Sequence, residues 1–242
     1  MGDKKKTLTA TIETHVAVSM RSYFSNNFIS SAAFFARQAL ALEQIGTDEV
    51  TREQKDQDQG FVLGSIIFSV TFLEALVKEM AVDYSEERYH QYPKPENGGH
   101  SKIAESWNRD LYPTSILDRY QHTLMLADRP IFNTAENPYQ NVNLLVKLRN
   151  SIIHYEPEDI DVFDTDPDEE INIHKMEARL KDKFPNNALY DAESYNYFPL
   201  KCFGHGCAEW SVQSAIAFAN AFFDKLGISN HSQKRWNELE TR

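Results

Sequence analysis

The fold of this chain is decided by one long apolar stretch, FVLGSIIFSVTFLEALVKEMA, which occupies Phe61–Ala81. Its apolar residues recur every three or four positions, as the buried face of a helix requires. The most apolar part, Phe61–Phe72, is interrupted by polar residues, and Glu74 and Lys78 come soon after it. This apolar run is too short and too polar to span a membrane. We therefore expect a core helix whose buried face consists of Ile66, Val70, Leu73, Val77 and Met80.

Helical patterns precede this stretch. No proline occurs before Pro93, so almost all of the first third can be helical. Ser30–Ile45 predicts a helix that Gly46 ends, and Thr47–Gln59 is interpreted as the solvated first turns of the core helix. Helical character is also expected within Thr9–Tyr23. The apolar face of the Ser30–Ile45 helix is expected to contain Phe34, Phe35, Ala39, Leu42 and Ile45.

Prolines and glycines divide the middle of the chain. Tyr84–Lys102 contains Pro93, Pro95 and an Asn-Gly-Gly break, which together predict a loop. Pro113 separates two shorter helices, and Thr114 is expected to cap the second of them. The helices predicted in this region are Ile103–Leu111, Thr114–Ala127 and a third from about Pro138 to His154.

The last third alternates between irregular and helical segments. Glu156–Glu170 is the most acidic part of the chain and predicts a solvated loop. Ile171–Phe184 predicts a short amphipathic helix, and Pro185–His205, which is rich in Tyr and Phe, is expected to pack irregularly on the bundle. Cys207–Leu226 predicts the final long helix, which Gly227 closes.

These elements define the class of fold and the number of domains. No internal repeat and no series of strands occurs, which predicts an all-α bundle with long connecting loops. A chain of 242 residues is long enough for one large domain. We expect a single helical domain over residues 1–242, with its core roughly between residues 30 and 226 and a polar, fraying tail after Ser229.

The composition limits the classes of function. The formal net charge of −11 argues against a general nucleic-acid coat protein, although it leaves room for a local basic cleft. Two cysteines rule out a disulfide framework, and the three lysines of the N-terminus precede no apolar signal core. We therefore expect a cytoplasmic protein without a membrane partner.

A second informative stretch, LLVKLRNSIIH, occupies Leu144–His154. It combines an apolar helical lead-in with Arg149 and, five positions later, His154. An acidic stretch with a proline follows at once, so the histidine lies near a helix end. Arginine and histidine are the pair that metal-free RNA cleavage needs, because the cation holds the phosphate and the imidazole moves a proton near neutral pH.

The same two residues also have an ordinary structural interpretation. Arg149 near a helix C-terminus interacts favourably with the helix dipole, and His154 can hydrogen-bond the last helix carbonyls. The spacing alone does not decide between the interpretations, since about one such match arises by chance in a chain of this composition.

The segment Arg149–His154, which reads Arg-Asn-Ser-Ile-Ile-His, resembles the Arg-x4–6-His motif of the HEPN superfamily (higher eukaryotes and prokaryotes nucleotide-binding). In that superfamily a small polar residue commonly follows the arginine, as Asn150 does here, and the motif lies on a late helix of an all-α bundle. The resemblance implies a homodimer that cleaves RNA without metal, with the RNA 2′-hydroxyl as nucleophile. Arg149 and His154 would be catalytic, and Asn150 would orient His154 or contact the phosphate.

Three further residues are candidates for supporting roles. Glu74 and Lys78 form an i,i+4 pair, which by itself is a routine helix-surface ion pair. Several HEPN families carry an acidic residue on a comparable helix, and Glu74 interrupts an apolar segment, so we expect a buried carboxylate with Arg149 as its partner. Tyr155 follows the histidine directly. One HEPN branch, paired with minimal nucleotidyltransferases, carries a modified tyrosine one position later, where this chain has Glu156.

The sequence favours no metal and no cofactor. Asp164–Asp168 resembles the start of an EF-hand loop, but glutamate and lysine stand where glycine and the bidentate glutamate are needed. Cys202, His205 and Cys207 lack the second ligand pair of a structural zinc site. No Gly-rich phosphate loop, nucleophile elbow or zinc-protease motif occurs.

Three functional hypotheses follow. The first is a HEPN-like endoribonuclease that acts on RNA as a homodimer, with a role in bacterial defence or as a toxin by analogy, and with a separate inhibitor or activator protein as a partner. The second is a non-catalytic HEPN-like module that binds a nucleotide or a protein. The third is an unrelated helical protein in which Arg149 and His154 face neither a cleft nor a dimer mate.

Overall fold

The computed structural model describes residues 20–86, 91–157, 175–190 and 197–242. This part of the chain is helical and contains no strand, which confirms the predicted all-α class. In chain order the helices are α1 (Ser25–Glu43), α2 (Arg52–Ser85), α3 (Gly99–Asn108), α4 (Ile116–Leu126), α5 (Tyr139–Ile153), α6 (Glu177–Leu180), η1 (Tyr197–Lys201), α7 (His205–Leu226) and α8 (Ser232–Asn237).

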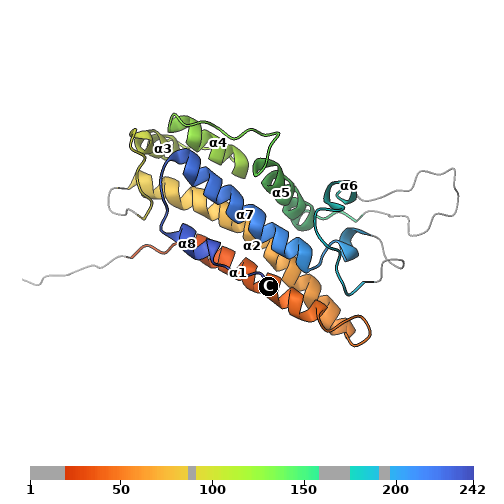
Figure 1. Ribbon diagram of the computed structural model, residues 1–242. Helices are drawn as coiled ribbons and strands as arrows, with labels where there is room; N and C mark the ends of the chain where they lie inside the picture. The colour runs from red at the N-terminus through yellow and green to blue at the C-terminus, as the bar shows by residue number, and fades with distance from the viewer. Residues whose placement is uncertain (1–19, 87–90, 158–174, 191–196) are drawn as a thin grey trace, which may run out of the picture.

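The 34-residue helix α2 organises the bundle, because α1, α3, α5 and α7 all pack against it. α1 and α7 lie along α2, while α3, α4 and α5 follow one another along one side of the bundle (Figure 1). The predicted buried face of α2 is confirmed, since Ile66, Val70, Leu73, Val77 and Met80 are fully buried. Burial of this continuous apolar face, at about 25 cal/mol per Å², is the main source of stability for such a bundle.

Small residues, and not the predicted aromatic face, let α1 approach α2. Its buried residues are Ser25, Ile29 and four alanines, whereas Phe34 is 46% exposed. Gly64 of α2 lies so close to the ring of Phe35 that a Cβ atom there would be 2.8 Å from it. The start of α2 is fixed by Thr51, whose side chain and that of Gln54 form a capping box.

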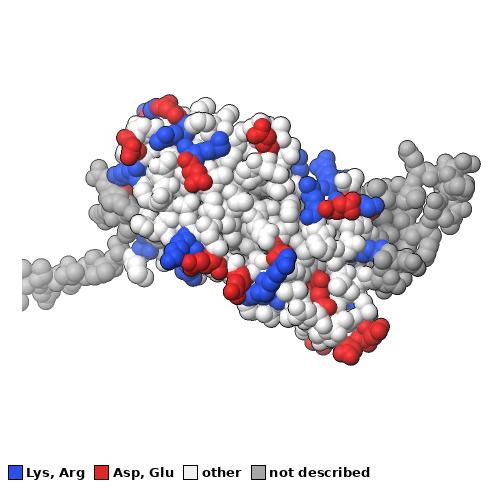
Figure 2. Space-filling model, viewed as in Figure 1, with Lys and Arg blue, Asp and Glu red and all other residues white. Residues whose placement is uncertain are grey.

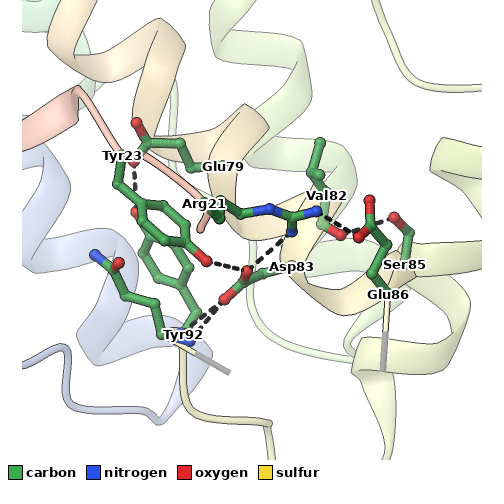
Figure 3. A network of polar contacts seen from close by, with 9 residues as sticks. Arg21, Tyr23, Glu79, Val82, Asp83, Ser85, Glu86 and Tyr92 are labelled. Atoms are coloured by element: carbon green, nitrogen blue, oxygen red, sulfur yellow. Dashed lines mark hydrogen bonds and ion pairs between the residues drawn. The ribbon is translucent and has the colours of Figure 1, made fainter. Parts of the chain in front are cut away.

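Two carboxylates near the C-terminal end of α2 hold the neighbouring segments (Figure 3). Glu79 accepts hydrogen bonds from the Ser25 backbone N–H at 2.9 Å and its hydroxyl at 2.6 Å, which caps α1 from another helix. Asp83 accepts hydrogen bonds from the Tyr23 hydroxyl and from the Tyr92 backbone N–H. The segment before α1 and the loop before α3 are therefore both tied to α2.

The predicted helix boundaries in the middle of the chain need correction. α3 begins at Gly99, inside the predicted loop, because Gly98 adopts a positive φ of 74° and turns the chain into the helix. The predicted N-cap of α4, Thr114, is wrong. Ser115 occupies that position, and its side chain makes no capping hydrogen bond.

Three predictions nearer the chain ends are wrong or lie outside the described residues. Helix α6 spans four residues and not the longer predicted segment Ile171–Phe184, of which residues 171–174 are not described. Residues 20–23 are not helical, while the rest of Thr9–Tyr23 and almost all of the acidic stretch lie outside the described residues. The tail is not frayed, since Trp236 of α8 is 1% exposed and packs against Phe72 and Phe223.

In the described part of the chain, α2 is the one helix that is long and apolar enough to cross a membrane. Half of its most apolar window is buried inside the bundle. Core helices of soluble proteins share these properties.

Candidate functional site

Helix α5 carries the Arg–His motif and matches its predicted bounds to within one residue at each end. Val142, Leu145 and Leu148 are fully buried and hold α5 against the bundle, where it packs on α2 and α7. The opposite side of α5 faces solvent. His154 is the C-cap residue, and its backbone N–H donates to the carbonyl oxygen of Asn150 at 2.9 Å.

A pocket of about 470 Å³ lies at the C-terminal end of α5. Lys147, Asn150 and His154 line it from one face of the helix, because residues three, four and seven positions apart lie above one another. A segment distant in the sequence closes the pocket with Lys175 and Arg179, so two parts of the chain build the site.

The pocket is basic although the chain as a whole is acidic. Lys147, Lys175 and Arg179 line it, against a single carboxylate, Glu156, among its described residues. Neither Lys147 nor Arg179 forms an ion pair with any described residue. Figure 2 shows lysine and arginine side chains over α6 and the end of α5, with acidic side chains beside them. Positive charge in a concave site favours phosphate groups.

Arg149 does not line this pocket. It precedes His154 by five positions, which on an α-helix is a rotation of about 140°. Its side chain is half-buried, and its Nε atom is buried without a hydrogen-bond partner. Within one chain, therefore, Arg149 does not share the pocket that His154 lines.

The predicted partner of Arg149, Glu74, lies across the interface between α2 and α5. The Glu74 carboxylate accepts a hydrogen bond from Lys78 Nζ at 2.8 Å and lies 3.9 Å from the Arg119 guanidinium. The Lys78 hydrogen bond is the largest cause of the lowered pKa of Glu74, to which the charges of Lys78, Arg149 and Arg119 add. The expectation of a buried carboxylate was wrong, because the Glu74 side chain is 35% exposed, and its direct partner is Lys78.

Sequence reasoning missed Lys147, Lys175 and Arg179. Lys147 could have been found, since it precedes His154 by seven residues, or two helical turns. No local pattern connects Lys175 or Arg179 to the motif, because the folding of the chain brings them there. Tyr155, predicted in a supporting role, lines the pocket and is 59% exposed.

The described residues contain no group of three or more His, Cys, Asp or Glu side chains arranged to hold a metal ion. Cys202 and Cys207 are buried free cysteines. His205 lies at the start of α7, where its Nε2 atom is 3.0 Å from the carbonyl oxygen of Thr241.

The fold and the site thus define an all-α bundle with a basic pocket at the end of a histidine-bearing helix. Comparison with protein-family models, with curated proteins and with solved structures gives no significant match. The resemblance to the HEPN superfamily rests on the Arg149–His154 motif and on the general plan of the bundle.

Proposed function

We propose that this protein is a metal-independent endoribonuclease of HEPN type that acts as a homodimer at the α5 pocket. The observation that carries the proposal is that His154 lines one pocket with Lys147, Lys175 and Arg179. The cations attract the RNA phosphate, and the exposed imidazole at the helix end is accessible to a bound chain.

The chemistry follows from these groups. The RNA 2′-oxygen attacks phosphorus and the bond to the 5′-oxygen breaks, which leaves a 2′,3′-cyclic phosphate and a 5′-hydroxyl end. One group must take the 2′-proton and another must protonate the leaving oxygen. One histidine lines the pocket among the described residues. A second copy would bring a second His154, which supports a composite dimer site.

In this proposal Arg149 contributes only through the composite site. It would stabilise charge on the pentavalent phosphorane, as a guanidinium does through two parallel hydrogen bonds. Because Arg149 does not line the pocket, the proposal assigns the guanidinium that contacts the phosphate to a second copy of the chain. Asn150, which lines the pocket, would orient His154 or donate to a phosphate oxygen.

One observation favours a second candidate function. A net charge of −11 is unfavourable for contact with a long nucleic acid, so a non-catalytic module that binds a nucleotide or a protein partner is the alternative. A role in defence or as a toxin, and an inhibitor or activator protein, belong to the first proposal by analogy alone.

The experiment is an RNA cleavage assay with the parent, His154→Ala and a matched control, His231→Ala. His231 is also an exposed histidine beside a helix, but it lies next to α8, which packs against α1 and α7 and not against α5. We expect at least a hundredfold loss of cleavage rate in His154→Ala and no change in His231→Ala. Equal rates in all three proteins would refute the proposal.

A further inference from the structure

A second, apolar pocket of about 260 Å³ adjoins the basic pocket. Ser151 and Tyr155 line both, so the two pockets are neighbours at the end of α5. The remaining apolar lining comes from α2, α5 and the segment before α7, and consists of Leu63, Ile152, Phe198, Pro199 and Phe203.

Besides Ser151, whose hydroxyl donates to the Leu148 carbonyl oxygen, and Tyr155, the polar side chain that lines the apolar pocket is Gln59 of α2. Its Nε2 atom donates a hydrogen bond to the Tyr190 hydroxyl at 3.0 Å, which fixes the orientation of the amide. Its carbonyl oxygen accepts no hydrogen bond from the described residues. An apolar slot with one oriented acceptor suits a flat ring that carries a hydrogen-bond donor on its edge.

We infer that the apolar pocket binds a nucleobase of the RNA whose phosphate occupies the basic pocket. This inference rests on the proposed function and names the part of the substrate that the site reads. A nucleotide joins an anionic group to an aromatic ring by a short linker. The two neighbouring pockets match that arrangement, because one is basic and the other is apolar.

Tyr155 has the position of a stacking platform. Its ring is 59% exposed and stands where the two pockets meet. Stacking on an aromatic side chain is a common way to hold an unpaired base, because every base has a π-face. The Gln59 carbonyl oxygen can then accept a hydrogen bond from a donor on the edge of the base, such as the exocyclic amino group of adenine or cytosine or the N3–H of uracil.

The test measures binding and not cleavage. Adenosine, cytidine and uridine 5′-monophosphates and ribose 5-phosphate are titrated by calorimetry into the full chain. We expect adenosine monophosphate to bind about tenfold or more tightly than ribose 5-phosphate, the range found for one base stacked on an aromatic residue. The cytidine and uridine compounds, whose rings can stack on the same residue, should also bind more tightly than ribose 5-phosphate.

Four variants localise the binding energy. Leu63→Trp, which fills the pocket, and Tyr155→Ala should lose the advantage of the base and keep the affinity for ribose 5-phosphate. Tyr155→Phe, which keeps the ring, should match the parent. Gln59→Leu, which removes the acceptor, should weaken the binding of all three nucleoside monophosphates and leave the affinity for ribose 5-phosphate unchanged. Circular dichroism confirms that each variant folds, and a misfolded Leu63→Trp leaves Tyr155→Ala as the deciding variant.

Equal binding of adenosine monophosphate and ribose 5-phosphate by the parent, or no binding of either, would overturn the inference. An advantage of the base that persists in both Leu63→Trp and Tyr155→Ala would also overturn it. The two proposals fail separately. A protein that binds the base but cleaves no RNA contradicts the ribonuclease alone, and one that cleaves RNA without base-dependent binding contradicts the base pocket alone.

Discussion

Arg149 of α5 and Glu74 of α2 are electrostatic neighbours across the interface of the two helices. The Glu74 carboxylate is held in its charged form first by the Lys78 hydrogen bond and then by the charges of Lys78, Arg149 and Arg119, which together lower its pKa. Three cations from three helices thus surround one carboxylate. The charge of Arg149 thus links the motif helix α5 electrostatically to the core helix α2.

We expect Glu74→Gln to destabilise the protein at neutral pH by about 0.5–1 kcal/mol, a modest figure because solvent screens this half-exposed group. Because the pKa of Glu74 is lower in the folded than in the unfolded protein, its carboxylate stabilises the fold fully at pH values above the unfolded pKa of about 4.3. This contribution is lost as the pH falls through the lower pKa of the folded state. Urea unfolding of parent and variant between pH 3 and pH 7 measures the difference. Glu105→Gln, in a more exposed pair with Arg109, is the control and should change stability less. An equal loss in both would contradict this account.

The buried carboxyl group of Asp58 should make the stability of the fold depend on pH in the opposite direction. Burial is the main cause that raises the pKa of Asp58 to about 7, and the charge of Glu43 adds to it. The hydrogen bond that Asp58 accepts from Asn187 at 2.7 Å acts in the other direction and lowers the pKa. A raised carboxyl pKa means that the parent loses stability as the pH rises from about 4 to 7, since burying the charge is costly.

Asp58→Asn removes that charge and should therefore gain stability relative to the parent as the pH rises, by on the order of 1–3 kcal/mol at pH 8. Thermal and urea unfolding at pH 5 and pH 8 test this. The control is Asp56→Asn, at an exposed position of the same helix, which should show no such trend. A stability difference that does not grow between the two pH values would rule out a raised pKa at Asp58.

Two glycines of α2 should respond to alanine in opposite directions. At Gly60 a Cβ atom meets nothing within 4 Å, so Gly60→Ala should stabilise the helix by about 0.5–1 kcal/mol. At Gly64 it would lie 2.8 Å from the Phe35 ring, which is stacked between Phe61 and Phe68. Gly64→Ala should therefore destabilise by about 1–3 kcal/mol. Stabilisation by both substitutions, measured by urea unfolding, would contradict the close packing of α1 on α2.

The cations of the basic pocket should govern RNA affinity and its salt dependence. Lys147→Ala and Arg179→Ala should each weaken binding of a short RNA several-fold and reduce the slope of log affinity against log salt by about 0.7. Lys234→Ala, at an exposed site on α8, is the control and should change neither. Fluorescence anisotropy at several salt concentrations gives both quantities. Identical slopes for Lys147→Ala, Arg179→Ala and Lys234→Ala would place the RNA elsewhere.

Much of the fold could be predicted from the sequence because apolar periodicity reports burial directly. The buried face of α2, the bounds of α5 and the closure of α7 by Gly227, whose φ is 74°, are confirmed. Tertiary contacts decided the rest. Trp236 fixes α8 in a tail whose composition is polar, and Glu79 caps α1 from another helix.

The site could be predicted less completely than the fold. The motif located His154 at a helix end, where the structure has it. Whether Arg149 shares a cavity with His154 depends on which side of α5 each side chain occupies and on whether a second copy of the chain is present. The spacing of the two residues in the sequence specifies neither of these. Arg179 and the apolar pocket beside Tyr155 arise from long-range packing, so no local pattern could have predicted them.

The most direct measurement is an analysis of the ends that the parent protein leaves on a defined RNA in the presence of EDTA. The account predicts cleavage to 2′,3′-cyclic phosphate and 5′-hydroxyl ends, blocked by a single 2′-deoxy substitution at the cleaved nucleotide and by His154→Ala. Cleavage that stops in EDTA, or 5′-phosphate ends from a 2′-deoxy substrate, would contradict it.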